Sequence, residues 1–385
     1  MSVTWHTPAS PGDLLSLTHA SEGNYSAFLP HPLPPRVNFG LHAIRQLSKA
    51  EHSLGRLSEL GVQLPSPELL TYAFMRREAV LSSEIEGIHT TIAEVYQYEA
   101  EQTDQGNGYA REAYNNFDAL RFGLEQMKSR EISLGLIREL HERLMHEVLD
   151  ARGRNKNPGA FRETQNFIGR PGSKLSQAIY VPPPAERVEE LLYDWEKFVR
   201  TNNELPILAK IAFAHYQFEA IHPFEDGNGR VGRLLISMML QKEGLLAIPI
   251  LSLSSYIAAT RNDYYAGLNS VTREGAWQEW FEYFVQGVQE AAEDAIERSQ
   301  KILALHRSYH TKVLEHSRSR AVELVDFIFC QPVFTQSQAM QTINVTPPAM
   351  AGYCKLFEEL GLIQEMTGNY NRRVYRVPEL LGVLG

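Results

Sequence analysis

The sequence predicts a mainly α-helical protein that contains one small β-hairpin and ends in a separate small domain. Apolar residues recur at helical spacing over most of residues 41–315. Helix-start signals precede several of these stretches, namely Ser66-Pro67-Glu68, the capping box from Thr91 to Glu94, and Ser133. The spacing and the caps together predict an all-α core.

Two segments lack helical spacing. Residues 1–40 are rich in Pro and Gly and are expected to form an extended lead-in on the surface. Within residues 151–184, Asn166–Ile168 and Ala178–Val181 are expected to form two short strands around Pro171-Gly172. A hairpin inside a helical protein breaks the local pattern, which makes it a candidate functional segment.

Residues 318–385 are predicted to form a winged-helix domain. The expected order is a helix over 321–329, a helix after Thr335, a helix from Thr346-Pro347 to Gly361, and strands Ile363–Glu365 and Val374–Arg376 around the turn 368–371. Three helices followed by a hairpin is the order of a winged helix.

Composition excludes several classes of protein. Two cysteines, Cys330 and Cys354, are too few for a disulfide framework, and neither has a partner at zinc-ligand spacing. The N-terminus has no signal-peptide pattern, and the most apolar stretch, residues 245–259, is too short to span a bilayer. The net charge of −9 gives no general attraction to nucleic acid or anionic membranes. A cytoplasmic protein without membrane contact is expected.

The segment from Ile221 to Arg233, IHPFEDGNGRVGR, lies between two apolar helical stretches and suits a polyphosphate. Gly227 and Gly229 lack a Cβ, so backbone N–H groups can approach an anion, and the following helix N-terminus adds donors. Arg230 and Arg233 are three residues apart and therefore share a helix face from which they can clamp phosphates.

Two further side chains complete a candidate site in this segment. Asp226 offers a hard oxygen ligand for Mg²⁺, and His222 can take a proton from an attacking hydroxyl. Each residue alone has an ordinary explanation, because loop aspartates cap helices and a histidine after an apolar helix is more often structural. Their combination within twelve residues favours the functional interpretation.

The segment resembles, without a gap, the motif H-x-F-x-[D/E]-G-N-G-R-x-x-R of the Fic (Fido) family, whose members transfer AMP from ATP to hydroxyl side chains of proteins. The resemblance extends over roughly residues 30–300. It implies a Fic catalytic core over residues 101–300 and an associated N-terminal region with an inhibitory helix over residues 1–100. The predicted winged helix follows this core.

The resemblance assigns roles to single residues. His222 is expected to be the catalytic base, Phe224 the anchor of the loop in the core, and Asp226 the Mg²⁺ ligand. Gly227, Asn228 and Gly229 are expected to surround the α- and β-phosphates, with Arg233 reaching the γ-phosphate. The ATP-binding residues implied are Glu86, His222, Gly227, Asn228, Gly229, Arg230, Val231, Gly232, Arg233 and Tyr264.

Tyr264 is included because residues 255–265 are similar to the family segment that covers the adenine; a core aromatic is the alternative. The hairpin at 166–181 resembles the family's flap, which aligns a target segment by strand addition. A close relative of the Fic fold phosphorylates its targets, and its motif lacks the second glycine and the second arginine. Gly229 and Arg233 are both present here, which favours AMP transfer with ATP as the default donor.

Residues 82–87, SSEIEG, resemble the Fic inhibitory motif [S/T]-x-x-x-E-[G/N], with Ser82, Glu86 and Gly87 at the motif positions. Its place before the catalytic loop implies the subclass with an N-terminal inhibitory helix. Glu86 is expected to pair with Arg233, so that ATP binds in a non-productive pose. The same carboxylate is expected to position water for removal of AMP. A solvated surface glutamate is the alternative.

The predicted function is therefore an autoinhibited protein adenylyltransferase that uses ATP and Mg²⁺ and modifies a target protein and itself. A homodimer is left open, and the sequence does not identify the target. The alternative from another class is a DNA-binding regulator that reads duplexes through Lys355 and the wing residues Arg372, Arg373 and Arg376. Target docking or packing against the core is the preferred explanation of the wing.

Overall fold

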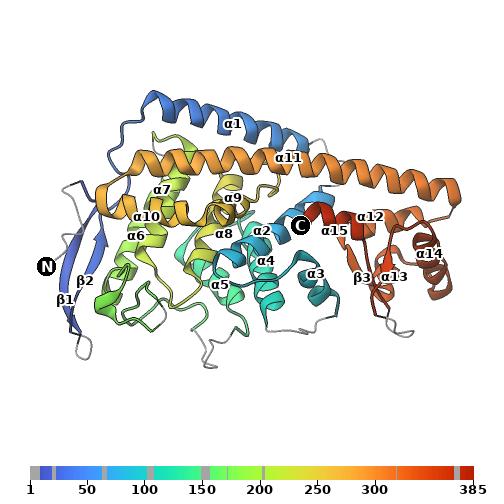
Figure 1. Cartoon of the computed structure of the whole chain (residues 1–385), viewed down its shortest axis with the longest axis horizontal. Coiled ribbons are helices and arrows are strands. Elements are labelled where there is room, and N and C mark those ends of the chain that lie inside the picture. The colour runs from blue at the N-terminus through green and yellow to red at the C-terminus, as the bar shows by residue number, and fades with distance from the viewer. Residues whose placement is uncertain are drawn as a thin grey trace. The chain divides into compact units, whose positions relative to one another are not determined.

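The computed structural model describes residues 9–19, 23–62, 67–101, 108–148, 157–170, 172–201, 204–317, 319–367 and 373–385. Within these ranges there are fifteen α-helices and five strands, three of them only two or three residues long, which confirms the predicted mainly α-helical class (Figure 1). No helix in the same ranges has both the length and the hydrophobicity that crossing a bilayer requires.

The chain divides into two compact units. Unit 1 comprises residues 1–52, 118–245 and 256–290, and unit 2 comprises residues 53–117, 246–255 and 291–385. Four helices continue across the division: α1 (Leu41–Val62), α4 (Tyr109–Gln126), α9 (Leu253–Ala259) and α11 (Trp277–His316). The units do not follow the three predicted segments, because residues 53–100 and 318–385 belong to the same unit.

Unit 1 is built around a buried helix pair. The pair consists of α7 (Ile207–Ile221) and α8 (Asn228–Lys242). The other elements that lie wholly in unit 1 are β1 (Gly12–His19), β2 (Gly23–Pro30), α5 (Leu134–Leu144), η1 (Leu175–Gln177), η2 (Ala185–Arg187), α6 (Val188–Arg200) and α10 (Arg261–Glu274). Almost every residue of α7 is buried. The indoles of Trp195 and Trp280 donate to the α7 carbonyls of Ala214 and Ala212, at 2.8 and 2.9 Å. These bonds satisfy the indole N–H groups inside the core.

The expectation of an extended lead-in is wrong for residues 12–30. They form an antiparallel hairpin, β1 with β2, in which Gly12 lies opposite Pro30 (Figure 1). Gly and Pro stand at the ends of the strands, where they do not disturb the ladder. The N–H of Phe28 donates to the carbonyl of Val181 at 2.9 Å, so the hairpin joins the end of the predicted flap.

The flap at residues 166–181 is present in a reduced form. Instead of two strands there is a single antiparallel bridge between Ile168 and Tyr180, with the short helix η1 between them. Two hydrogen bonds make the bridge, from the Ile168 N–H to the Tyr180 carbonyl (2.8 Å) and from the Tyr180 N–H to the Ile168 carbonyl (3.1 Å). Pro171 lies outside the described residues.

Unit 2 contains α2 (Glu68–Ile85), α3 (Ile92–Glu101), α12 (Val322–Cys330), β3 (Val333–Thr335), α13 (Gln336–Ile343), α14 (Pro347–Glu359), β4 (Gln364–Glu365), β5 (Val374–Arg376) and α15 (Pro378–Leu384). The predicted three helices and two strands after residue 318 are therefore present. Strand β3 and helix α15 were not predicted, and β3 pairs with β5 to give the sheet order β3-β5-β4. The winged-helix assignment stays a prediction, and the turn 368–371 lies outside the described residues.

The predicted helix starts at Thr91 and Ser133 have the expected side-chain hydrogen bonds, whereas Thr346, the predicted cap of α14, makes no capping bond. The Thr91 N–H donates to the Glu94 carboxylate (2.7 Å), and the Glu94 N–H donates to the Thr91 hydroxyl (3.2 Å). The Leu136 N–H donates to the Ser133 hydroxyl at 3.2 Å. Ser66 lies outside the described residues. Local capping chemistry was thus readable from the sequence.

Candidate active site

The loop 222–227 joins α7 to α8 through two left-handed residues. His222 ends α7 with φ 49° and ψ 62°, and its N–H donates to the Phe218 carbonyl at 3.0 Å. Gly227 precedes α8 with φ 77°. A left-handed conformation is unusual for a residue with a Cβ. Its presence at His222 ends α7 and turns the chain away from the helix axis. The loop opens directly onto the N-terminus of α8, as predicted.

Phe224 is fully buried and is held by two asparagines. The Asn228 carboxamide accepts from the Phe224 N–H (2.8 Å) and donates to the Phe224 carbonyl (2.9 Å). Asn166, at the start of the flap, donates to the same carbonyl at 3.0 Å. Because the Asn228 side chain is used within the loop, its expected contact with phosphate has to come from its backbone N–H in the first turn of α8.

His141 on α5 fixes the other end of the loop, and the sequence analysis did not single it out. The Gly159 N–H lies 2.9 Å from Nδ1 of His141, so this nitrogen accepts. Nε2 therefore carries the proton and donates to the Asp226 carbonyl at 3.0 Å. The ring also stacks on Phe224 with centroids 3.8 Å apart. Burial lowers the pKa of His141 to about 4, so the neutral ring that these bonds require is present at pH 7.

Arg162 is a second residue that sequence reasoning missed. Its side chain is 3% exposed and donates to four backbone carbonyls, those of His222 (2.9 Å), Pro183 (2.5 Å), Thr164 (3.2 Å) and Ile221 (3.4 Å). Burial lowers the pKa of its guanidinium to about 10, so it stays charged at neutral pH. The arginine thereby ties the carbonyl of His222 to the segments on either side of the flap.

If the loop catalyses the AMP transfer that the motif resemblance implies, replacing Arg162 by lysine is expected to lower kcat by about 10²-fold while the KM for ATP changes little. Lysine keeps the charge but loses the planar fork that reaches several carbonyls, and small displacements of a reacting group have effects of this size. The control is Arg138→Lys, an exposed arginine that donates to the Gly159 carbonyl at 2.7 Å. If Arg162→Lys and Arg138→Lys have the same kcat, Arg162 does not position His222.

Arg230 and Arg233 are almost fully buried, at 3% and 2% exposure. Two arginines on an ordinary surface helix would lie in solvent, so their burial agrees with a role inside the site. The residues between them contribute differently. Val231 is in the core, and a Cβ at position 232 would press on His215 and Glu219 of α7. Gly232 therefore permits close packing of α8 on α7, and only backbone atoms of these two residues can approach a nucleotide.

Asp226 is exposed at the end of the loop, and its Oδ1 accepts from the Gly227 N–H at 2.7 Å. The bond orients the carboxylate beside the N-terminus of α8. A carboxylate in this position fits Mg²⁺, which takes one or two protein oxygens and bridges to phosphate oxygens. The loop from His222 to Arg233 lies entirely within unit 1, at the junction of α7 and α8.

Comparison with known proteins decides the family. Residues 44–125 match the family model "Fic/DOC family N-terminal", and residues 131–240 match "Fic/DOC family". This chain is a Fic family protein. The second match contains the complete loop from His222 to Arg233, which confirms the resemblance predicted from the motif.

Several curated relatives are named protein adenylyltransferases. The chain is 32% identical over 202 residues to "Probable protein adenylyltransferase aq_aa38" of Aquifex aeolicus, covering 52% of this chain and 58% of that protein. It is 32% identical over 161 residues to "Protein adenylyltransferase fic-1" of Caenorhabditis elegans, covering 39% of this chain and 27% of that protein. The chain thus spans 58% and 27% of these two relatives.

Solved structures show the same fold. A Fic family protein from Desulfovibrio desulfuricans G20 aligns with a TM-score of 0.58 at 22% identity, covering 90% of this chain and 98% of that one. Residues 134–508 of Fic-1 from C. elegans align with a TM-score of 0.51 at 23% identity, covering 67% and 74%. At these identities the likeness concerns the Fic fold alone.

Tyr264, expected to contact the nucleotide in this Fic protein, is 1% exposed. Its hydroxyl lies 2.9 Å from Nε2 of His215, and its ring packs near Trp280. This placement favours the alternative interpretation, a core aromatic. A regular helical spacing did not reveal which of the two adjacent tyrosines on α10 points inward; Tyr265 is the exposed one.

The buried histidines of the Fic core predict acid sensitivity. Burial lowers the pKa of His215 to about 3, with the charge of Arg233 as a smaller cause, and that of His141 to about 4. In the unfolded chain both have pKa values near 6.5. The unfolded state therefore binds more protons below pH 6.5, and stability falls as the pH decreases toward the folded values.

The free energy of unfolding is expected to fall by about 2 kcal/mol per histidine between pH 6.5 and 5. Urea unfolding at a series of pH values measures it. His215→Asn should flatten this dependence, whereas His146→Asn, at an exposed position, should not. A parent protein equally stable at pH 5 and 6.5 would contradict the burial of these neutral rings.

The inhibitory motif of the Fic protein lies at the end of α2, in unit 2. Glu86 is the exposed C-cap residue, and Gly87 follows with φ 83°. The Gly87 N–H donates to the Glu84 carbonyl (2.9 Å), which closes the last turn. Glycine at this position thus terminates the helix directly after the glutamate. Ser82 is buried. The predicted pairing of Glu86 with Arg233, in unit 1, stays a prediction.

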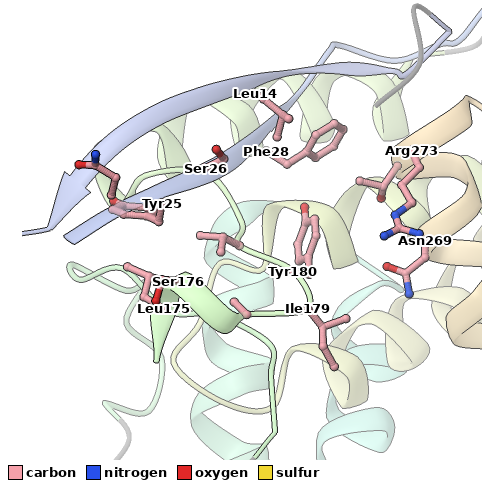
Figure 2. A pocket seen from close by; sticks show the side chains of 14 residues that line it. Leu14, Tyr25, Ser26, Phe28, Leu175, Ser176, Ile179, Tyr180, Asn269 and Arg273 are labelled. Atoms are coloured by element: carbon pink, nitrogen blue, oxygen red, sulfur yellow. The ribbon is translucent and has the colours of Figure 1, made fainter. Parts of the chain in front are cut away.

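A cavity of about 290 Å³ lies beside the flap of the Fic core (Figure 2). Figure 2 shows Tyr25 and Phe28 of β2, Ile179 and Tyr180 of the flap, and Arg273 of α10 around it. The Tyr180 hydroxyl donates to the Ala220 carbonyl at 2.6 Å, two residues before His222. The cavity therefore adjoins a flap that is fastened to the end of α7.

The wing side chains that would read DNA have protein partners. Arg376 donates from Nε and Nη2 to the Gln364 amide oxygen at 3.0 and 2.7 Å, and Lys355 lies 3.7 Å from the Glu359 carboxylate. Hydrogen bonding to Tyr375 raises the pKa of Arg373. Arg372 lies outside the described residues. The DNA-binding alternative gains no support from these contacts.

Proposed function

We propose that this protein is an ATP-dependent protein adenylyltransferase. The hydroxyl oxygen of a target side chain attacks the α-phosphorus of ATP and forms the new O–P bond. The bond from the α-phosphorus to the bridging oxygen breaks, and diphosphate leaves with its electron pair. His222 accepts the proton of the hydroxyl.

The observation that carries the proposal is the geometry of the loop 222–233. A left-handed His222, a left-handed Gly227 and the N-terminus of α8 follow one another within seven residues, and Arg230 and Arg233 of α8 are buried. Such an arrangement presents backbone donors and two cations to a polyphosphate beside a possible base. The names of the curated relatives describe the same reaction.

Labelled ATP tests the reaction type. The protein is incubated with Mg²⁺ and ATP that carries the label at the α- or the γ-phosphate, alone and with a cell lysate, and proteins are separated under denaturing conditions. Covalent label retained only from the α-position, on a target or on the protein itself, supports AMP transfer. Label retained only from the γ-position means kinase chemistry and contradicts the proposal.

Asp226 is proposed to hold Mg²⁺, which would supply positive charge to neutralise the charge that develops on the phosphates. Asp226→Ala is expected to leave a low activity that no longer responds to Mg²⁺ between micromolar and millimolar concentrations. The matched control is Glu225→Ala, the adjacent exposed carboxylate, which accepts from Asn157 at 3.2 Å. If Asp226→Ala keeps the Mg²⁺ titration of the parent, Asp226 is not the ligand.

The flap and the cavity in Figure 2 are proposed to receive the target segment. Ile168 and Ile179 expose 42% and 61% of their surface on the flap, next to the bonds that fasten it to the end of α7. A target strand laid along this edge would carry its hydroxyl toward His222. The activity is proposed to be limited by Glu86, which would compete with the γ-phosphate for Arg233.

A further inference from the structure

Three metal-ligand side chains of unit 2 converge away from the Fic loop. His306 and His310 are four residues apart on α11 and so share one helix face. Asp326 on α12 faces them. Its Oδ1 lies 2.7 Å from Nε2 of His306 and 3.5 Å from Nε2 of His310. The three ligand atoms all lie within 4.8 Å of one another.

The packing of α12 holds this cluster in place. Leu324, Val325, Ile328 and Phe329 are fully buried, so Asp326 projects from the opposite side of the helix. Phe329 also lies edge-on against the His306 ring, with centroids 5.0 Å apart. The His306 side chain is 17% exposed and that of Asp326 is 61% exposed. The ligands are thus ordered by the core yet reachable from solvent.

An ordinary ion pair does not account for the whole arrangement. One carboxylate oxygen faces two imidazole nitrogens, although a single histidine would suffice for a surface pair, and exposed pairs add only about 0–1 kcal/mol to stability. Two histidines at i and i+4 are also the spacing by which a helix chelates zinc. A cation between the three atoms would replace the hydrogen bond by coordination.

We propose that His306, His310 and Asp326 bind a divalent transition metal ion of the zinc and cobalt class. Two imidazoles and one carboxylate are ligands of this class, and three protein ligands leave a position for water. Mg²⁺ prefers a set made of oxygens, so the cluster discriminates against the ion proposed for Asp226. A bound ion would join α12 to α11 and therefore stabilise the C-terminal part of unit 2.

The test uses the full chain without an affinity tag, stripped with a chelator and dialysed. Isothermal titration with Zn²⁺ should give one site per chain, Co²⁺ should give a visible d–d absorption band, and Zn²⁺ should raise the melting temperature. All three signals should be lost in His310→Gln and in Asp326→Asn. They should persist in His316→Gln, a control on the same helix, and in Asp226→Ala.

Two results would overturn the proposal. The first is a parent protein that shows neither heat nor a cobalt band. The second is binding that keeps its affinity in a folded His310→Gln/Asp326→Asn double variant, because the ion would then lie elsewhere. Circular dichroism of each variant shows whether it is folded, and Mg²⁺ titrated at the same concentrations should give no heat at this site. Labelling with ATP is a separate readout, so its failure leaves the metal site unaffected.

Discussion

His222→Ala is expected to lower AMP transfer by about 10²–10⁴-fold, the range for loss of a general base. The affinity for ATP should change little, since His222 acts on the hydroxyl of the target. Label transfer from the α-position at saturating ATP measures the rate, and a binding titration measures the affinity. Alanine at φ 49° would still be in the left-handed region. The loop should therefore keep its backbone hydrogen bonds, and the backbone strain at this position should be unchanged.

The control for this variant is His146→Ala, which removes an exposed histidine from the same unit. It should transfer AMP at the rate of the parent. If His222→Ala also retains that rate and its melting temperature, the proton of the target hydroxyl has another acceptor, and the role given to His222 is wrong.

Glu86→Gly is expected to raise self-modification and target labelling by about 10–100-fold. A charge-assisted hydrogen bond contributes about 1.5–3 kcal/mol, and its loss would free Arg233 for the γ-phosphate and align the α-phosphate with the hydroxyl. Removal of AMP from modified protein should be lost in the same variant. Because Glu86 caps α2 and does not lie inside it, the substitution should cost less stability than the ~1 kcal/mol of an interior glycine.

Glu84→Gly is the matched control, an exposed glutamate two residues earlier on the same helix. It removes the same charge from the same end of the helix but should leave labelling unchanged. Because Glu84 lies within α2, its substitution should cost more helix stability than Glu86→Gly does. Glu86→Ala should behave as Glu86→Gly does. Equal labelling by parent, Glu84→Gly and a folded Glu86→Gly would show that Glu86 is an ordinary surface residue.

The residues of the candidate loop could be grouped from the sequence because the proposed phosphate-binding segment is contiguous. The spacing of Gly227, Arg230 and Arg233 was enough to propose phosphate binding for them. His141 and Arg162 were missed because their contacts join positions 85 and 60 residues apart along the chain, and no local pattern reports such contacts. Burial of these two polar side chains would have marked them as functional, but their burial depends on tertiary packing and is not visible in the sequence.

The hairpin β1–β2 was missed for a different reason. The segment was judged by its Pro and Gly content, although the strand residues between Gly23 and Pro30 carry an apolar cluster, including the buried Ala27 and Phe28. Strand β3 was missed because its three residues are too few to show a periodic pattern. The helices and the caps at Thr91 and Ser133 were predictable, because 3.6-residue spacing and cap chemistry are local.

The two hydrogen bonds between the Asn228 side chain and the Phe224 backbone close the loop on itself before any nucleotide binds. The donors that would face the phosphates are then already ordered, so little conformational entropy of the loop is lost when ATP binds. The same closure couples the chemistry to the fold, because the ring of bonds exists only while α7 and α8 are packed. A mutation in the packed interface of α7 and α8, far from any substrate atom, should therefore lower turnover even when it is too mild to lower solubility.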